Sequence, residues 1–103
     1  LAPEQVRVLT IGDDAPLVEY AGAIVAELRR SRVRVQGDYS TGKINGKILD
    51  AERARVHTML VIGGQEKDAG TVAVRLHGKG NVGVKPRAEA VAHILAAIRE
   101  RRS

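Results

Sequence analysis

Thr58-Met59-Leu60-Val61-Ile62-Gly63-Gly64 is the most informative run in this chain. Residues 58–62 are almost continuously apolar, and two glycines end the run. A strand with one face in water alternates apolar and polar residues, whereas a strand covered on both faces does not. The run therefore predicts a strand in the middle of a sheet, covered on both sides.

Shorter runs on either side predict the other strands, because their apolar and polar residues alternate. They occupy residues 6–11, 33–36, 71–76 and 82–84. Residues 78–81 are the turn formers Gly-Lys-Gly-Asn, so the last two runs predict a β-hairpin.

Three further segments carry apolar residues at spacings of three and four, which is the period of a helix. The first opens with Pro16, the second spans residues 43–55, and the third opens with Pro86. Basic residues (Arg29, Arg30 and Arg32) crowd the end of the first segment, as a helix C-terminus favours. The alternation of strand and helix periods along the chain predicts the α/β class.

The composition indicates one domain, residues 1–103, that folds without cross-links. Of its 103 residues 44% are hydrophobic and none is cysteine, which fits a reducing compartment, and we expect the cytoplasm. No apolar run approaches the roughly 18–20 residues of a membrane span, so we expect no membrane partner. The chain starts at Leu1 and its only methionine is Met59, so we expect either a processed product or, more simply, a piece of a longer protein.

The sequence carries no pattern of a catalytic or metal site. His57, His77 and His93 share no ligand spacing, so we expect no metal site. The glycines of residues 78–83 match a dinucleotide motif, but no helix follows directly, so a hairpin turn explains them. Glu66 and Asp68 could act as acid and base, although solvated turn carboxylates are more common. We therefore expect a binding module with no catalytic residue in this chain.

A basic helix face is the best candidate for binding. Lys43 and Lys47 are four residues apart in the second helical segment, whose apolar residues would face the sheet. The two lysines would form an exposed ridge suited to phosphates, with Tyr39 beside it for base stacking. The net charge of +5 is compatible with a polyanionic partner. A solvated helix face without a ligand remains the alternative.

Four segments in order resemble the C-terminal anticodon-binding domain of threonyl-tRNA synthetase. They are Leu1-Ala2-Pro3-Glu4-Gln5-Val6, Lys43-Ile44-x-x-Lys47-Ile48-x-Asp50-Ala51, Met59-Leu60-Val61-x-Gly63-x-x-Glu66 and Gly70-Thr71-Val72-Ala73-Val74-Arg75. The resemblance implies a five-stranded mixed sheet with three helices, and a tRNA anticodon stem-loop as partner. It also implies that aminoacylation, with its ATP, magnesium and zinc, belongs to a catalytic domain of a threonine–tRNA ligase outside this chain. The parent would be a homodimer and the isolated domain a monomer, with no cofactor of its own.

The resemblance also assigns site residues. Lys43 would neutralise a phosphate, Glu66 would accept from a base amine or imino group, and Arg75 would offer its planar fork to a base edge or phosphate. Lys47 matches a family lysine.

The chain departs from the family pattern at three positions of the site. Ser40 replaces an arginine, Thr41 an asparagine, and Leu49 an arginine on the helix. By helical arithmetic Leu49 lies off the apolar stripe and is exposed. Two functions follow: a tRNA anticodon-binding domain, or a protein-interaction or dimerisation module that reuses the fold with weakened RNA binding.

Overall fold

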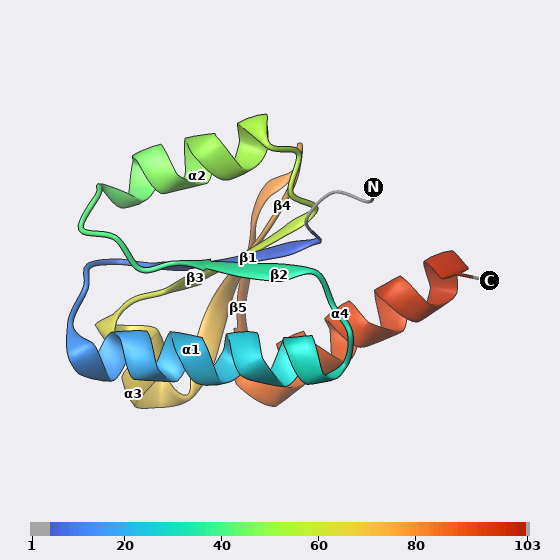
Figure 1. The fold of residues 1–103 in the computed structure, drawn as a ribbon, viewed down its shortest axis with the longest axis horizontal. Helices are drawn as coiled ribbons and strands as arrows, with labels where there is room; N and C mark the ends of the chain where they lie inside the picture. Colours follow the sequence, from blue (N-terminus) through green and yellow to red (C-terminus); the bar gives the residue numbers. More distant parts are fainter. Residues whose placement is uncertain (1–4, 103) are drawn as a thin grey trace.

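The chain folds into one mixed five-stranded sheet with helices on both faces (Figure 1). The computed structural model describes residues 5–102, and the side chains of residues 5–98. The elements are β1 (Val6–Thr10), α1 (Ala15–Arg30), β2 (Val35–Asp38), α2 (Ile44–Arg53), β3 (Thr58–Ile62), α3 (Gly64–Ala69), β4 (Thr71–Leu76), β5 (Gly80–Pro86) and α4 (Arg87–Arg102).

The strand order is β2-β1-β3-β4-β5, which places β3 in the centre as the sequence predicts. β1 pairs in parallel with β2 and β3, whereas β3–β4 and β4–β5 are antiparallel. All five residues of β3 are buried, because helices cover both of its faces. The five-stranded mixed sheet and the β4–β5 hairpin are therefore confirmed.

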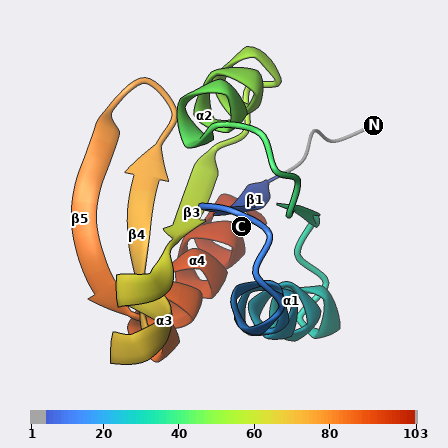
Figure 2. The ribbon, with the colours of Figure 1, turned by 90° about the vertical axis from the view of Figure 1, so that its left-hand side faces the viewer.

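The two faces of the sheet are covered unequally. α1, α3 and α4 lie on one face, over the larger apolar cluster (Figure 2). α2 lies alone on the other face, where Leu9, Ala51, Val56, Met59 and Val61 form a smaller cluster. β4 and β5 extend past α2, so Val84 of β5 is 58% exposed. The part of the α2 face at the outer strands is thus open to solvent.

The structure corrects the number of helices, since it holds a fourth, α3, where the sequence predicted a turn. Two local features make this six-residue helix. The carboxylate of Glu66 accepts a hydrogen bond of 2.7 Å from the Gly63 N–H at the start of the helix. Gly70 closes it with a left-handed φ of 70°. Neither feature produces the apolar period that marks a longer helix.

The two helix-to-strand connections, α1–β2 and α2–β3, share one geometry. The N–H of Val33 donates to the carbonyl of Leu28, and the N–H of Val56 donates to the carbonyl of Ala51, both at 3.0 Å. Just before these valines, Arg32 and Arg55 take left-handed φ values of 65° and 59°. Both helices, α1 and α2, therefore end in a Schellman motif, with arginine at the position where glycine is usual.

Candidate nucleic-acid interface

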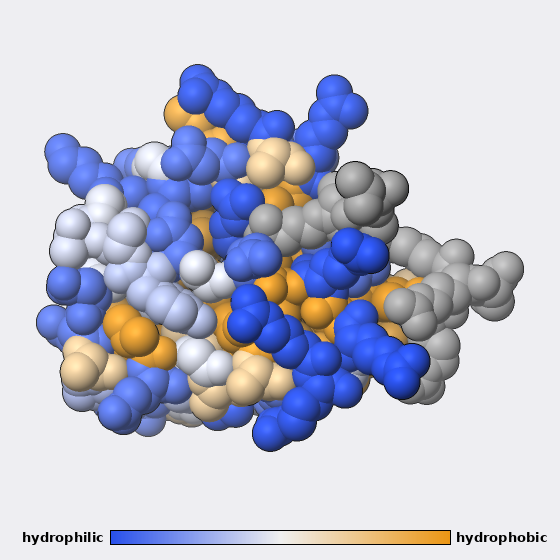
Figure 3. Space-filling view, viewed as in Figure 1, coloured by the Kyte–Doolittle hydropathy of each residue, from blue (hydrophilic) through white to orange (hydrophobic). Residues whose placement is uncertain are grey.

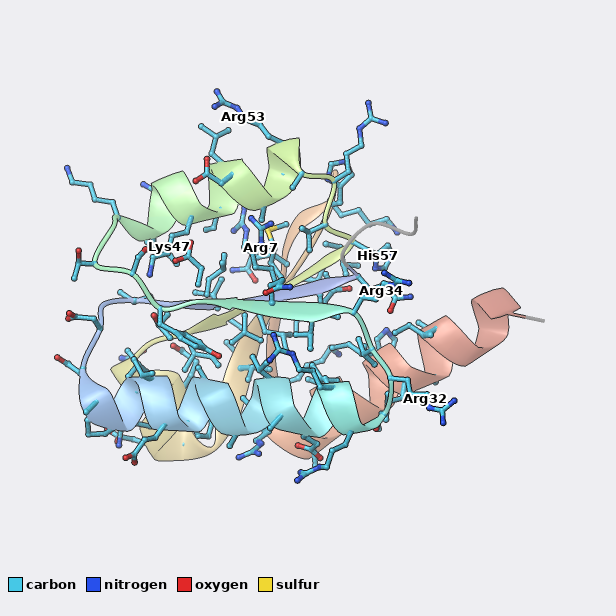
Figure 4. All side chains as sticks on the ribbon, in the orientation of Figure 1. Arg7, Arg32, Arg34, Lys47, Arg53 and His57 are labelled. Atoms are coloured by element: carbon cyan, nitrogen blue, oxygen red, sulfur yellow. The ribbon has the colours of Figure 1, made fainter. Side chains whose placement is uncertain are left out.

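Lys47 is buried under α2 and is not part of an exposed ridge, which corrects the sequence prediction. Its side chain is only 3% exposed. The ammonium donates to the carbonyl oxygens of Ser40 at 2.6 Å, Thr10 at 2.7 Å and Asp38 at 3.4 Å. Figure 4 shows Lys47 between the first turns of α2 and the ends of β1 and β2. Backbone carbonyls accept the hydrogen bonds of this ammonium, so Lys47 ties α2 to the loop after β2 and to the ends of β1 and β2.

The prediction that Lys43 and Lys47 share one helix face is wrong because Lys43 lies outside the helix. Lys43 is the N-cap residue of α2, with extended backbone angles of φ −66° and ψ 141°. Two residues four apart share a face only when both are helical. Lys43 is therefore exposed at the start of α2 while Lys47 points inward.

The loop of residues 39–43 presents Thr41 and Lys43 to solvent. The carboxylate of Asp38 accepts hydrogen bonds from the hydroxyl of Ser40 at 2.7 Å and from its N–H at 3.2 Å. Burial raises the pKa of Asp38, but the hydrogen bonds from Ser40 and the charges of Lys47 and Arg7 together lower it by more than burial raises it. The pKa of Asp38 is therefore below its ordinary value. The loop is thus built on an ionised aspartate.

Tyr39 faces the opposite side of the sheet from this loop surface, which corrects its expected place beside the lysines. Its ring packs against the α1 cluster and over Gly37, where a Cβ atom would overlap the ring. Burial raises the pKa of the Tyr39 phenol, and the nearby Arg29 partly offsets this. Tyr39 is half-buried against the α1 cluster, so its ring offers no open stacking face beside α2.

Arg75 lies on the α2 face of the sheet, in the part that α2 leaves uncovered. In β4 it pairs with Met59 of β3 and Asn81 of β5, and Met59 belongs to the α2-side cluster. Its terminal nitrogen reaches over Gly80, a glycine with a φ of 77°. The buried Nε has no hydrogen-bond partner among the described residues. A buried donor without an acceptor is costly.

Glu66 stands apart from the other candidates. It belongs to α3, which lies on the α1 side of the sheet, and one carboxylate oxygen already accepts the Gly63 N–H. The structure therefore places Thr41, Lys43 and Arg75 on the α2 side and Glu66 at the end of β3. Among the described side chains, no hydrogen bond joins Glu66 to Lys43 or Arg75.

Three exposed apolar side chains flank these residues. Leu49 is 49% exposed on α2, as the sequence predicted. The sequence did not single out Ile11 beside Gly63, or Val84 beside Ala73. Both lie where no helix covers the strand end or edge, which apolar alternation alone does not reveal.

Two negative findings concern the part of the chain that the structure describes. It contains no group of three or more histidine, cysteine or acidic side chains placed to hold a metal ion. Among the helices described, none has the length and apolar character to cross a bilayer.

Together, the fold and this surface define a small α/β binding domain whose exposed basic and hydrogen-bonding groups suit a nucleic acid. The family model described as "Anticodon binding domain" matches residues 5–97. The chain belongs to this family.

Similar proteins place it within the family. It is 42% identical over 92 residues to the threonine–tRNA ligase of Symbiobacterium thermophilum, covering 89% of this chain and 14% of that ligase. The RNA binding domain of threonyl-tRNA synthetase from Cryptosporidium parvum Iowa II superimposes with a TM-score of 0.83 at 30% identity, over 92% of this chain and 24% of that one. Prolyl-tRNA synthetase of Cryptosporidium parvum shares the fold, with a TM-score of 0.86 at 19% identity over 96% of this chain and 21% of that one. The domain is homologous to part of the threonine–tRNA ligases, and it spans a small fraction of their length.

Proposed function

We propose that this domain binds the anticodon stem-loop of a threonine tRNA and positions it for a catalytic domain elsewhere in a longer threonine–tRNA ligase. The match of residues 5–97 to the anticodon-binding family carries this proposal. The curated relatives bear the ligase name, and the chain covers 14% of the first of them. ATP, magnesium and zinc would act in the remainder of a cytoplasmic, homodimeric parent, while this domain alone is a monomer without a cofactor.

The residues suit this task in different ways. Arg75 is partly exposed and can give its terminal nitrogens to a base edge or a phosphate. Lys43 and Thr41, exposed at the start of α2, can contact the backbone of the loop. The free oxygen of Glu66 can accept from a base amine. Lys47 and Tyr39 act indirectly, because Lys47 fixes the loop and Tyr39 packs in the core.

A protein-interaction module is not favoured. That alternative rested on Leu49, which is exposed as expected. However, the exposed large apolar residues of the described chain are Ile11 after β1, Leu49 on α2, and Val82 and Val84 on β5, whereas a protein interface needs one contiguous apolar core. The homology to anticodon-binding domains points to RNA instead.

A titration tests the proposal. The domain is mixed at low salt with a threonine anticodon stem-loop or with a hairpin that has the same stem and a scrambled loop. We expect tighter binding of the threonine loop. Arg75→Gln should cost about 1–3 kcal/mol and relax the preference at one base. Lys43→Gln should weaken both RNAs equally and lower the salt slope by about one.

Lys85→Gln is the matched control, since it removes one charge from β5 on the side facing α4. It should leave the affinity for both hairpins and the salt slope unchanged. Equal affinity of the unaltered domain for both hairpins would refute the proposal.

A further inference from the structure

A small cavity lies between α4 and the strands β3, β4 and β5, on the face of the sheet opposite to α2 (Figure 2). Its volume is about 70 Å³. The floor is apolar and buried, and it includes Leu60 of β3, Val74 of β4, and Ala90 and Ile94 of α4. Protein interiors are close-packed, so a space of this size needs a local cause.

Local features of β5 and α4 leave this space open. The β4–β5 ladder pairs Gly83 with Val74 and Asn81 with Arg75, which skips Val82. A bulge of this kind redirects a side chain, and Val82 lines the cavity while it is 43% exposed. Gly83 adds no side chain opposite Val74, and the residue of α4 beside the outer part of the cavity is the small Ala97.

The mouth of the cavity carries basic groups. Lys85 of β5 is half-buried, His57 before β3 and His93 on α4 are exposed, and all three line the cavity. Figure 4 shows His57 at the end of the sheet that lies above α4. Its Nδ1 atom and the hydroxyl of the buried Thr58 are hydrogen-bonded at 2.8 Å, which fixes the imidazole at this edge.

The protein supplies no anion for these groups within the described residues. The ion pairs of the described side chains join Lys67 to Asp68, His77 to Glu52 and Arg87 to Glu27, so none of them includes Lys85 or His93. No acidic side chain of the described chain lines the cavity. An apolar floor thus lies below a mouth that attracts negative charge.

This combination selects the chemistry of a ligand. Elsewhere the surface carries solvated polar groups, and in Figure 3 strongly hydrophilic residues gather over the end of α1 and the start of β2. An inorganic anion would leave the apolar floor of the cavity unfilled, and a hydrocarbon would leave the Lys85 ammonium without a counter-charge. An apolar chain that ends in an anion satisfies both parts.

The volume limits the length of that chain. An apolar cavity of about 150 Å³ holds benzene, so about half that volume takes roughly three to four carbon atoms. A carboxylate at the end of such a chain lies at the mouth. An α-amino acid suits the site less well, because its ammonium would lie beside Lys85 and His93 with no described carboxylate to pair with it.

We propose that this cavity binds a short aliphatic carboxylate, whose chain lies on Leu60, Val74 and Ile94 and whose carboxylate meets Lys85 and His93. The cavity is on the opposite face of the sheet from Lys43 and Arg75, so this site is separate from the proposed RNA surface. Either function can therefore fail without the other.

A titration with 3-methylbutanoate tests the site. The methyl groups of the domain are isotope-labelled and followed by NMR, and we expect saturable shifts at Leu60, Val74 and Ile94, with a Kd in the millimolar range that suits so small a ligand. 3-Methylbutanol has no charge and should bind about tenfold more weakly. Acetate lacks three carbons and should bind roughly 50-fold more weakly, at about fourfold per carbon. Free leucine should cause no saturable shift.

Two variants separate the mouth from the floor. Lys85→Gln combined with His93→Gln should weaken 3-methylbutanoate about tenfold and leave 3-methylbutanol unchanged, because only the carboxylate uses these groups. Ala97→Leu fills part of the cavity and should weaken both ligands. Lys67→Gln combined with His77→Gln is the matched control, since it removes one lysine and one histidine from outside the lining.

The inference is overturned if 3-methylbutanoate causes no saturable shift, or if 3-methylbutanol or leucine binds as tightly. It is also overturned if the control variant loses as much affinity as the variant of Lys85 and His93, or if Ala97→Leu folds and binds unchanged. Should Ala97→Leu not fold, the variant of Lys85 and His93 decides the question. The affinity for the anticodon stem-loop should be the same with and without the carboxylate.

Discussion

Replacing Lys47 by methionine tests whether the buried lysine holds the domain together. Methionine keeps the length and apolar character of the side chain but removes the ammonium. The carbonyls of Thr10 and Asp38, which end β1 and β2, and of Ser40 in the loop after β2 then lose a donor. Because the side chain is only 3% exposed, water cannot reach every carbonyl without displacing α2.

The expected cost can be estimated from the bond lengths. The bonds to Ser40 and Thr10, at 2.6 and 2.7 Å, are short and charge-assisted, and each such bond contributes about 1.5–3 kcal/mol. The bond to Asp38, at 3.4 Å, contributes little. Removing the desolvated charge recovers part of this, so we expect a loss of about 3 kcal/mol. In a domain of this size that lowers Tm by about 15 °C.

Chemical denaturation in urea measures the effect. Lys43→Met is the matched control, since it removes the same group from an exposed N-cap position and should change the free energy of unfolding by less than about 0.5 kcal/mol. A loss below about 1 kcal/mol for Lys47→Met would refute the reasoning, because it would mean that water replaces the ammonium without cost.

Three further predictions concern single residues. Leu49→Arg should leave the free energy of unfolding within about 0.5 kcal/mol, because Leu49 is half exposed, and should add about 1 kcal/mol to stem-loop affinity in a titration; a loss of several kcal/mol in stability would contradict its exposure. Gly37→Ala should cost about 1–3 kcal/mol in urea denaturation, since the new Cβ overlaps the Tyr39 ring, and the same change made in a Tyr39→Ala background should cost much less. Asp38 has a lowered pKa in the folded state, so its carboxylate stabilises the fold above the unfolded pKa of about 3.9 and this stabilisation is lost as pH falls through the folded pKa. The free energies of unfolding of the unaltered domain and Asp38→Asn should therefore differ at pH 6 and converge at low pH; a constant difference would show that ionisation of Asp38 does not matter.

Most of the fold follows from apolar periods in the sequence. The run of residues 58–62 identifies the central strand because both of its faces are covered, and the structure buries all five residues. α3 is not detected in this way because a single hydrogen bond to a side chain, donated by the Gly63 N–H to the Glu66 carboxylate, starts it. The ends of α1 and α2 are also hidden, because Arg32 and Arg55 stand where sequence rules look for glycine.

The site follows less well, because it depends on which way a few polar side chains turn. The helical period correctly predicts that Leu49 is exposed. It does not predict that Lys47 turns inward, because the carbonyls that its ammonium binds belong to residues seven to 37 positions away. Tyr39 follows Val35 and Gly37 on alternate positions of one strand face, so the strand period beyond residue 36 would have placed it in the core. The exposure of Val84 depends on how far α2 extends across the sheet, which no local pattern encodes.

The hydrogen bond from Lys47 to the Ser40 carbonyl also affects the free energy of RNA binding. The segment that presents Thr41 and Lys43 is fixed at Ser40, which donates to the Asp38 carboxylate and accepts from the Lys47 ammonium. Ordering a flexible loop at the moment of association would cost conformational entropy and weaken binding. Here folding has already ordered part of that segment. An RNA that meets Thr41 and Lys43 therefore meets a preorganised surface, and more of the contact energy remains as affinity.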